Sequence, residues 1–258
     1  MTPSSLIVLG VESSCDDTAA AVVRGGREIL SNCVSGQEEF HRRFAGVVPE
    51  IASRQHTRCI SQLTQAVLES TGGTPDAVAA TVAPGLMGPL LVGVNLAKAL
   101  SYAWGVPFVP VHHLEGHSFS AFRSDTPPTW PVLALIVSGG HTSLVWCEAP
   151  HHYRTLGSTR DDAVGESFDK VARLLDLPYP GGPSIQKAAE AGNPNAYDFP
   201  RGMTKTDTLD FSYSGLKTAV LYRMREGAQC VSDLAASFQH AAVDTLVIKT
   251  RLAVEQTG

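Results

Sequence analysis

The sequence predicts an α/β protein made of two similar domains, and three observations lead to this prediction. Buried apolar runs of strand length alternate with segments of helical periodicity in the first half. That half opens with a strand, a small polar turn and a returning strand, and the same pattern begins again at Val132. Proline-rich residues 123–131 lie between the copies and are typical of a connector. We therefore expect an internal duplication, with domains at 1–122 and 123–258 that face each other across a cleft.

The first domain is expected to open with three strands, after which helices and strands alternate. Its first strand is a continuous apolar run, which is typical of a strand buried on both faces. Pro49 opens the first long helix, because a proline in the first helical turn loses no hydrogen bond. The predicted strands are 6–11, 19–23, 27–33, 77–82 and 106–111, and the predicted helices begin at residues 49, 90 and 114.

Two turns of the first domain have the composition of ligand-binding turns. The turn at 12–18, Glu-Ser-Ser-Cys-Asp-Asp-Thr, combines hydroxyls, carboxylates and free backbone N–H groups. Such a hairpin turn can hold a phosphate or its metal ion, although an ordinary Ser/Asp turn is the alternative. The glycines of 83–89 permit close approach by another backbone or by a ligand.

A histidine-rich segment follows the fifth predicted strand. His113 and His117 are four residues apart at the start of a helix, so both imidazoles can point to one metal ion. The alternative is that they are ordinary histidines without a ligand. Neither H-E-x-x-H nor H-x-x-E-H fits, because Leu114 follows His113 and Gly116 separates Glu115 from His117. At least one further ligand must come from elsewhere.

The second domain repeats the strand–turn–strand opening and then becomes mainly helical. We expect strands at 132–137, 143–147 and 153–158, and helices at 161–175, after 217 and at 232–254. The turn Ser138–Gly139–Gly140 suits a phosphate, because its N–H groups are unobstructed by side chains. Asp161 and Asp162 suit the dipole of a helix start, whereas Asp169 lies two turns in and could reach a ribose or amino group. Residues 180–183, Pro-Gly-Gly-Pro, are expected to form a rigid turn.

The composition is that of a globular protein without a strong overall attraction to nucleic acid. The chain has 258 residues, of which 43% are hydrophobic and 17% charged, an ordinary globular balance. A net charge of −5 provides no strong field for nucleic acid. A local basic patch could still bind RNA, although a solvated face is the interpretation that composition favours; the candidates are Arg42, Arg43, Arg54 and Arg58.

Cysteine usage and hydropathy bear on the compartment. The five cysteines are odd in number and none forms a C-x-x-C pair, which suits a reducing cytosol. The N-terminal apolar run is too short for a signal peptide, and no run reaches the length of a membrane span. We expect a cytoplasmic protein without membrane association.

Eight segments together resemble one known family across almost the whole chain. The resemblance is to the tRNA threonylcarbamoyladenosine transferases, the TsaD family of the actin/Hsp70/sugar-kinase (ASKHA) superfamily. It implies an α/β actin-like ATPase fold of two duplicated domains, each with a mixed sheet flanked by helices. The matching segments are 10–18, 46–56, 83–93, 110–117, 136–142, 161–175, 179–183 and 210–218.

The resemblance implies an activity and a set of site residues. Members transfer the threonylcarbamoyl group of threonylcarbamoyl-AMP to N6 of adenosine 37 in tRNAs that read ANN codons. His113 and His117 match the family's metal ligands, and the expected metal is Fe(2+). Glu12 matches an acidic residue of the first phosphate turn and is our candidate catalytic residue. The residues that match nucleotide contacts, to threonylcarbamoyl-AMP or to ATP or AMP, are Ile136, Val137, Ser138, Gly139, Gly140, Asp169 and Gly182.

The resemblance also implies partners and one departure from the family pattern. The expected partners are tRNA, a TsaB-like paralogue and a TsaE-like P-loop ATPase, with a dimer formed through the helices at 49–70 and 88–104. Family members continue past residue 258 with a third metal ligand and part of the adenosine site. The second domain is therefore expected to be incomplete here, and substrate and metal binding are expected to be weak.

Three alternatives to the transferase stay open from the sequence. A shortened member could serve as a scaffold for its partners rather than as an enzyme. A metalloprotease is disfavoured by the spacing of the histidines. A sugar or acetate kinase would share the phosphate turns, but such kinases hold Mg²⁺ through carboxylates and water rather than histidine pairs.

Overall fold

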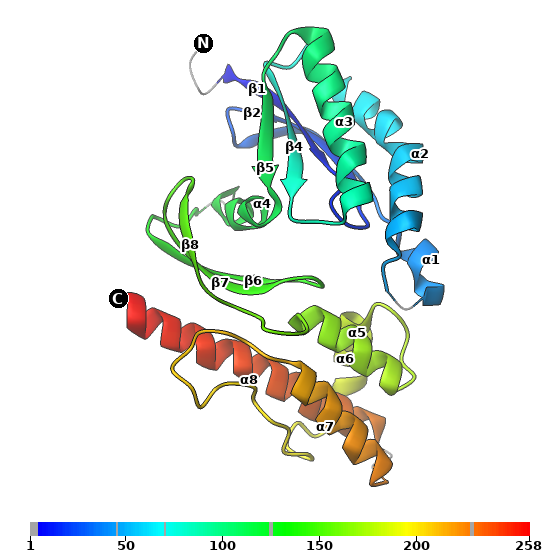
Figure 1. The fold of residues 1–258 in the computed structure, drawn as a ribbon, viewed down its shortest axis with the longest axis vertical. Coiled ribbons are helices and arrows are strands. Elements are labelled where there is room, and N and C mark those ends of the chain that lie inside the picture. Colours follow the sequence, from blue (N-terminus) through cyan, green and yellow to red (C-terminus); the bar gives the residue numbers. More distant parts are fainter. Residues whose placement is uncertain (1–4, 45, 70, 124–125, 228–229) are drawn as a thin grey trace. The chain divides into compact units, whose positions relative to one another are not determined.

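The chain forms two compact units, Met1–Pro127 and Pro128–Gly258 (Figure 1). The computed structural model describes residues 5–44, 46–69, 71–123, 126–227 and 230–258. The predicted division between residues 122 and 123 lies just before the boundary between these units. Residues 124 and 125 of the predicted connector, and residue 70 of the predicted dimer helix, lie outside the described residues.

The first unit contains a five-stranded mixed sheet with the strand order β3-β2-β1-β4-β5. β1 pairs antiparallel with β2 and parallel with β4, and β4 pairs parallel with β5. The carboxyl ends of β1, β4 and β5 therefore meet at one edge of the sheet. The strands are β1 (Ile7–Glu12), β2 (Thr18–Arg24), β3 (Glu28–Ser35), β4 (Ala77–Ala83) and β5 (Phe108–His112).

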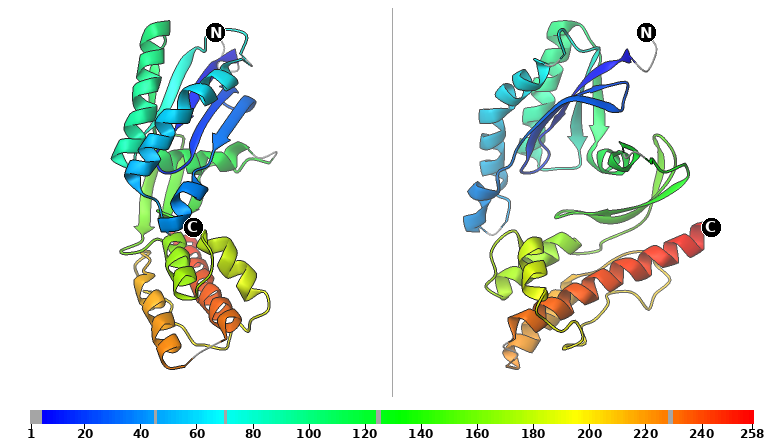
Figure 2. Two further views of the ribbon diagram at one scale, coloured as in Figure 1. Left: turned by 90° about the vertical axis from the view of Figure 1, so that its right-hand side faces the viewer. Right: turned by 180° about the vertical axis from the view of Figure 1, so that it is seen from behind.

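Two long helices, α2 (Pro49–Leu68) and α3 (Met87–Trp104), lie side by side against this sheet (Figures 1 and 2). Pro49 occupies the first turn of α2, as predicted. The apolar face of α2 is buried with β1 and β4 in one core, whose members include Ile60, Val67, Leu9 and Val78. Burying such aliphatic side chains stabilises the unit by about 1.5–3 kcal/mol each.

The remaining helices of the first unit are short, and two boundaries differ from prediction. Helix α3 begins at Met87 rather than residue 90, because Pro89 is compatible with a first helical turn. Helix α4 (His113–Ser120) begins one residue before the predicted start at residue 114, and the 3₁₀ helix η3 (Ala121–Arg123) follows it. The segment between β3 and α2 contains α1 (Glu38–His41) and the 3₁₀ helix η2 (Arg42–Phe44).

Within the residues that the structure describes, the second unit contains a three-stranded sheet, β6-β7-β8, and four helices. Both strand pairs are antiparallel. The prediction of a mixed sheet is therefore wrong for the described part of this unit. The helices share a core with the sheet that includes Leu144, Val171, Phe211 and Phe238. The elements are β6 (Val132–Val137), β7 (Thr142–Ala149), β8 (His152–Ser158), α5 (Val164–Leu174), α6 (Gly181–Ala189), α7 (Ser214–Arg225) and α8 (Val231–Thr257).

Two predictions about the second unit are wrong. Asp161 and Asp162 precede α5 rather than forming its first turn, because the Asp161 carboxylate accepts hydrogen bonds from the hydroxyls of Ser212 and Ser214, each at 2.6 Å. Residues 180–183 are not a free-standing rigid turn. Gly181 is the first residue of α6, and Pro180 supplies the extended residue before it.

Candidate functional site

Glu12 lies at the carboxyl end of β1, where its carboxylate contacts groups from β4, from α4 and from its own turn. Its carboxylate accepts a hydrogen bond from the Thr81 hydroxyl on β4 at 2.6 Å and lies 3.2 Å from Nδ1 of His113 on α4. It also accepts the backbone N–H of Ser14 in its own turn. These groups meet because β1, β4 and β5 are parallel neighbours and end at the same edge. The structure thus brings Glu12 together with the predicted histidine pair.

His113 and His117 face each other on the first turns of α4, as their spacing predicts. Their Nε2 atoms are 3.1 Å apart, and the two rings meet at an interplanar angle of 81°. The other nitrogen of His113, Nδ1, lies 3.2 Å from Oγ of Ser14 as well as from Glu12. The side chain of His113 is 21% exposed, so solvent and a ligand can both reach it.

The charges of this cluster suit a cation. Burial raises the pKa of the Glu12 carboxyl, but hydrogen bonds from His113, Thr81 and Ser14 outweigh burial and lower the pKa to about 2. Desolvation, together with the neighbouring His113, lowers the pKa of His117. Near neutral pH the cluster therefore holds one carboxylate and a neutral His117, the forms in which these groups bind metals.

The two histidines fit a metal ion. The Glu12 carboxylate can only accept a hydrogen bond from His113. The favoured tautomer of His113 therefore carries its proton on Nδ1 and leaves an electron pair on Nε2. A carboxylate behind a ligating histidine is the usual arrangement around protein-bound metals. Two nitrogens at about 2.0–2.1 Å from one tetrahedral metal would be about 3.3 Å apart, close to the observed 3.1 Å.

The histidines supply only part of a coordination sphere. Among the residues that the structure describes, no group of three or more His, Cys, Asp or Glu side chains is arranged to hold a metal ion. The other coordination positions would fall to water, substrate or further ligands. A cavity of about 210 Å³ adjoins the cluster, and its lining includes Glu12, Thr81 and Val111 together with small residues of the sheet.

Close packing of glycines fixes the turn that follows Glu12. A Cβ atom on Gly85 would lie 2.6 Å from the carbonyl oxygen of Ser14, and Leu86 N donates to that oxygen at 2.8 Å. The buried Ser13 hydroxyl donates to the carbonyl of Pro89 at 2.8 Å and accepts the N–H of Gly93 at 3.1 Å. The close approach predicted for the glycines of 83–89 is confirmed: Gly85 approaches the 12–18 turn, and Gly88 approaches the Ser53 side chain on α2.

A buried polar network supports the same turn from behind. Nδ1 of His56, on α2, lies 2.7 Å from the Thr18 hydroxyl, and Nε2 lies 3.1 Å from the carbonyl of Cys15. The Gln37 amide nitrogen lies 3.4 Å from His56 Nδ1, and its oxygen lies 3.2 Å from His41 Nε2. Desolvation lowers the pKa of His56. Sequence reasoning missed this network, because His41 and His56 stand alone in the sequence without motif spacing.

In the second unit, the predicted phosphate turn is open. Ser138 anchors it, since its Oγ accepts the N–H of His141 at 3.0 Å and that of Gly140 at 3.4 Å. Nothing lies within 4 Å of a Cβ built on Gly139 or Gly140, so a ligand can approach both backbones. Gly165 supports the turn, because its Cβ would lie 2.6 Å from the carbonyl oxygen of Ser138.

The other predicted nucleotide contacts fall into two groups. Ile136 is buried in β6, whereas Val137 is 46% exposed at the end of that strand. Asp169, on α5, accepts the backbone N–H of Gly181 at 2.7 Å, which brings it next to the start of α6. Gly182 follows directly and has open space around its Cα. Asp169 and Gly182 are therefore neighbours, as a shared ligand would require.

Several of these features depend on residues that the sequence did not single out. Thr81, Ser13 and His56 each hold the 12–18 turn in place. Thr81 had a usable signal, since it follows the apolar run of β4 at the edge where Glu12 ends β1. No helix within the described ranges has the length and apolar character needed to span a bilayer.

Comparisons with known proteins give the family. The family described as "tRNA N6-adenosine threonylcarbamoyltransferase" matches residues 28–258. Curated proteins of that name are 52% identical in Desulfitobacterium hafniense (strain Y51), over 97% of this chain and 76% of the relative, and 52% identical in Anaeromyxobacter dehalogenans (strain 2CP-C), over 94% and 75%. These matches favour the transferase over the protease and kinase alternatives.

A solved structure supports the fold. Component A of the (R)-2-hydroxyglutaryl-CoA dehydratase of Acidaminococcus fermentans superposes with a TM-score of 0.51, at 14% identity, over 96% of this chain and 79% of that one. The predicted actin-like α/β fold is thereby confirmed. The family match over nearly the whole chain, together with the relatives of the same name, shows that this chain belongs to the tRNA N6-adenosine threonylcarbamoyltransferases, enzymes of tRNA modification.

Proposed function

We propose that this chain transfers the threonylcarbamoyl group of threonylcarbamoyl-AMP to N6 of adenosine 37, with a divalent metal held by His113 and His117. The observation that carries the proposal is the pair of imidazole nitrogens 3.1 Å apart with Glu12 behind one of them. By resemblance to the family, the metal is Fe(2+). When bound, it would supply Lewis-acid polarisation of a substrate oxygen.

In this proposal Glu12 contributes by fixing the tautomer and the ring orientation of His113. Its carboxylate, ionised because its pKa is lowered to about 2, keeps the Nδ1–H tautomer and the ring orientation of His113. Thr81 and Ser14 in turn fix the carboxylate. We therefore assign Glu12 the role of a positioning residue, which refines the catalytic role expected from the sequence.

The second unit would hold the adenylate. The 138–140 turn, with open space beside the Gly139 and Gly140 backbones, suits the phosphate that becomes the leaving group. Asp169 and Gly182, side by side at the start of α6, suit the ribose or base. Ile136 supports the turn from within the core and Val137 presents an apolar surface beside it.

The transfer needs positioning more than a strong nucleophile. The N6 amine attacks the carbamoyl carbon, the bond from that carbon to the phosphate oxygen breaks, and AMP leaves while N6 loses a proton. Because the carbamoyl group is already activated as a mixed anhydride, orientation and charge stabilisation can supply most of the acceleration. Adenosine 37 lies in a single-stranded loop, where a base is displaced at low cost.

The partners follow from the same family. We propose tRNA, a TsaB-like paralogue and a TsaE-like ATPase, with the dimer surface on α2 and α3. Exposed apolar side chains on α3 support this surface, with Met87 74% and Tyr102 91% exposed. We place the protein in the cytoplasm, where tRNA is modified, and its five free cysteines suit that reducing compartment.

A transfer assay with metal control tests the proposal. Chain purified with Fe(2+) is mixed with threonylcarbamoyl-AMP and unmodified tRNA, and modified adenosine is quantified by mass spectrometry after nuclease digestion. We expect product that falls when the metal is chelated and returns when it is restored. Full activity in the chelated sample would contradict the metal's role, and the absence of product under every condition would favour the scaffold alternative.

A further inference from the structure

The cavity between α1 and α2 in the first unit has no role in the site described above. It measures about 340 Å³, within the usual size range of small-ligand pockets of about 300–1,000 Å³. Its lining contains three arginines and a single glutamate; the residues are Glu39, Phe40, Arg43, Ile51, Arg54, Gln55 and Arg58. This concentration of positive charge contrasts with the net charge of −5 for the whole chain.

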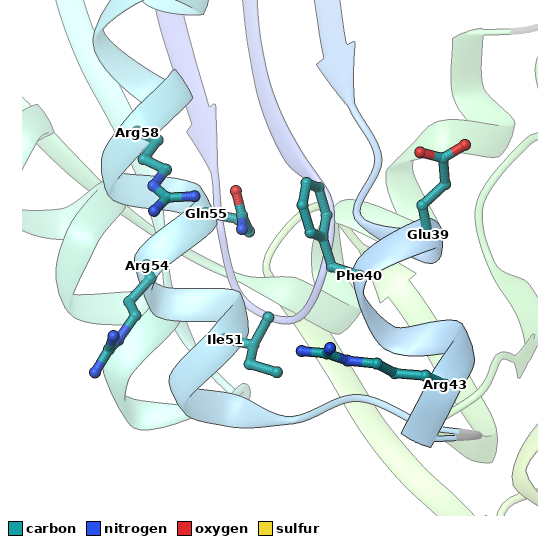
Figure 3. A pocket seen from close by; sticks show the side chains of 7 residues that line it. All are labelled: Glu39, Phe40, Arg43, Ile51, Arg54, Gln55 and Arg58. Atoms are coloured by element: carbon teal, nitrogen blue, oxygen red, sulfur yellow. The ribbon is translucent and has the colours of Figure 1, made fainter.

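The side chains of this pocket are arranged around an aromatic ring. Figure 3 shows the ring of Phe40, from α1, opposite Gln55 on α2, with the Arg58 side chain beyond Gln55 and the guanidinium of Arg43 near Ile51. Glu39 points away from the arginines in this view. Phe40 is 46% exposed, which leaves its ring accessible at the pocket.

The arginines differ in how free they are to bind a ligand. Arg54 forms an exposed ion pair with Glu50 at 2.7 Å. The guanidinium of Arg43 lies 4.7 Å from the centroid of the Phe44 ring, an arrangement that orients the group without neutralising it. Within the described residues, Arg58 forms no ion pair or hydrogen bond through its side chain. Arg43 and Arg58 are thus the two cations left for a ligand.

We propose that this pocket binds the tRNA substrate, with Arg43 and Arg58 on backbone phosphates and Phe40 beneath an unpaired base. Guanidinium groups bind phosphate in a bidentate manner, and an exposed aromatic ring stacks on unpaired bases. A small anionic metabolite would need no open aromatic surface. The inference rests on the proposed function, because that function makes tRNA the substrate.

The pocket is linked to the candidate metal site through α2. Gln55 lines the pocket, and the next residue, His56, contacts the carbonyl of Cys15 and the hydroxyl of Thr18. Cys15 follows Ser14, whose hydroxyl lies 3.2 Å from His113. RNA held at the pocket is therefore bound to the same rigid segment that supports the turn beside the metal ligands.

Neighbouring arginines provide a matched test of the phosphate contacts. Arg43 lines the pocket, whereas Arg42 forms an exposed ion pair with Glu38 at 3.0 Å. We compare Arg43→Gln, Arg58→Gln and their double variant with the control Arg42→Gln by measuring the Kd of unmodified tRNA by anisotropy over a range of salt concentrations. The double variant should bind at least about tenfold more weakly, and each lost contact should make the slope of log K against log salt shallower by about 0.7–0.9. The control should change neither quantity.

A second variant tests directly whether a base of the tRNA stacks on the ring at position 40. Phe40→Trp places a fluorophore in the pocket, and stacking on a base should quench it when tRNA is added, while Arg43→Gln/Arg58→Gln in the same background should reduce the quenching. Unchanged fluorescence, equal tRNA affinity in all variants, or no tRNA binding by the unaltered chain would overturn the inference. So would loss of self-association rather than of tRNA binding, since the pocket would then be a protein interface.

These measurements separate the pocket from the transferase activity. Binding of tRNA and quenching at position 40 need no threonylcarbamoyl transfer. If both depend on the arginines but no modified adenosine forms, the pocket inference stands and the proposed function fails. If transfer occurs at equal rates and equal half-saturating tRNA in the double variant and in Arg42→Gln, the proposed function stands and the pocket inference fails.

Discussion

The two units begin with the same strand–turn–strand pattern but use it in opposite ways. In the first unit the turn after β1 is filled with side-chain contacts: Glu12, Ser13 and Ser14 bond to β4, α3 and α4. In the second unit the turn after β6 is bare, with open space around Gly139 and Gly140. The first turn presents a carboxylate behind two imidazoles, and the second presents glycine backbone that a ligand can approach. One pattern thus carries groups that suit a cation in one copy and an uncrowded glycine turn, proposed for a phosphate, in the other.

The largest expected effect is the loss of metal affinity when the histidine pair of the first unit is broken. His117→Ala removes one of two facing imidazoles, so the affinity for Fe(2+) or Zn(2+) should fall at least about 100-fold, since even changes behind a ligand cost about 10–100-fold. Titration calorimetry with each metal measures this. His240→Ala is the control, because His240 lies on α8 beside Asp244 in the second unit. Equal metal affinity in both variants would show that the pair is not a metal site.

The glycines behind and within the second turn should differ in their tolerance of a methyl group. Gly165→Ala forces a Cβ within 2.6 Å of the Ser138 carbonyl oxygen, which should lower the free energy of unfolding by about 1–3 kcal/mol. Gly139→Ala meets nothing within 4 Å and should change stability little, while weakening adenylate binding. Chemical denaturation and AMP titration test both. Equal destabilisation by the two changes would contradict the description of an open turn.

The ionised carboxylate makes the first unit sensitive to acid. The pKa of Glu12 is about 2 in the folded chain against an ordinary value of 4.5, so its contribution is complete above pH 4.5 and is lost as the pH falls towards 2. The loss should be about 1–2 kcal/mol, since a third of the side chain is solvent-exposed and screened. Urea unfolding of the metal-free chain between pH 5 and 3 should show a steeper decline than in Glu12→Gln. Parallel curves would exclude the role of this carboxylate.

The smallest effect concerns the two serine hydroxyls. Ser13 is buried and bridges the carbonyl of Pro89 and the N–H of Gly93, so Ser13→Ala should cost about 1 kcal/mol of unfolding free energy. Within the described residues the Ser138 hydroxyl accepts hydrogen bonds only from N–H groups of its own turn, at 3.0 and 3.4 Å, and Ser138→Ala should cost less. Thermal unfolding ranks the two. The reverse order would show that the second turn is the more tightly held.

Local patterns predicted most of the elements and the parts of the site that are close in sequence. The pair His113 and His117 shares a helical face because four residues make about one turn. Asp161 was wrongly predicted to lie in the first turn of a helix. Its partners, Ser212 and Ser214, are about fifty residues away, and the helix-dipole argument considers only residues next to the helix start. His56 was missed for the same reason, since its contact with Cys15 depends on how α2 lies on the sheet.

The helix start at Gly181 shows a different limit. A Pro-Gly-Gly-Pro sequence favours a turn on propensity alone, yet Gly181 begins α6. Its Cα lies so close to α5 that a Cβ would be 2.5 Å from the Phe168 carbonyl oxygen and from Asp169 Cα. Glycine is required by the contact between two helices, and propensity scales cannot register a contact of that kind.

The buried network of His56, Thr18, Gln37 and His41 bears on how tightly a substrate can bind. Its hydrogen bonds fix the turn beside Glu12 when the chain folds, so the backbone there has little freedom left to lose when a ligand arrives. Affinity at the candidate metal site would then reflect the contacts made rather than the ordering of a loop. Such a site should associate with its ligand in a single kinetic phase, without a slower rearrangement afterwards.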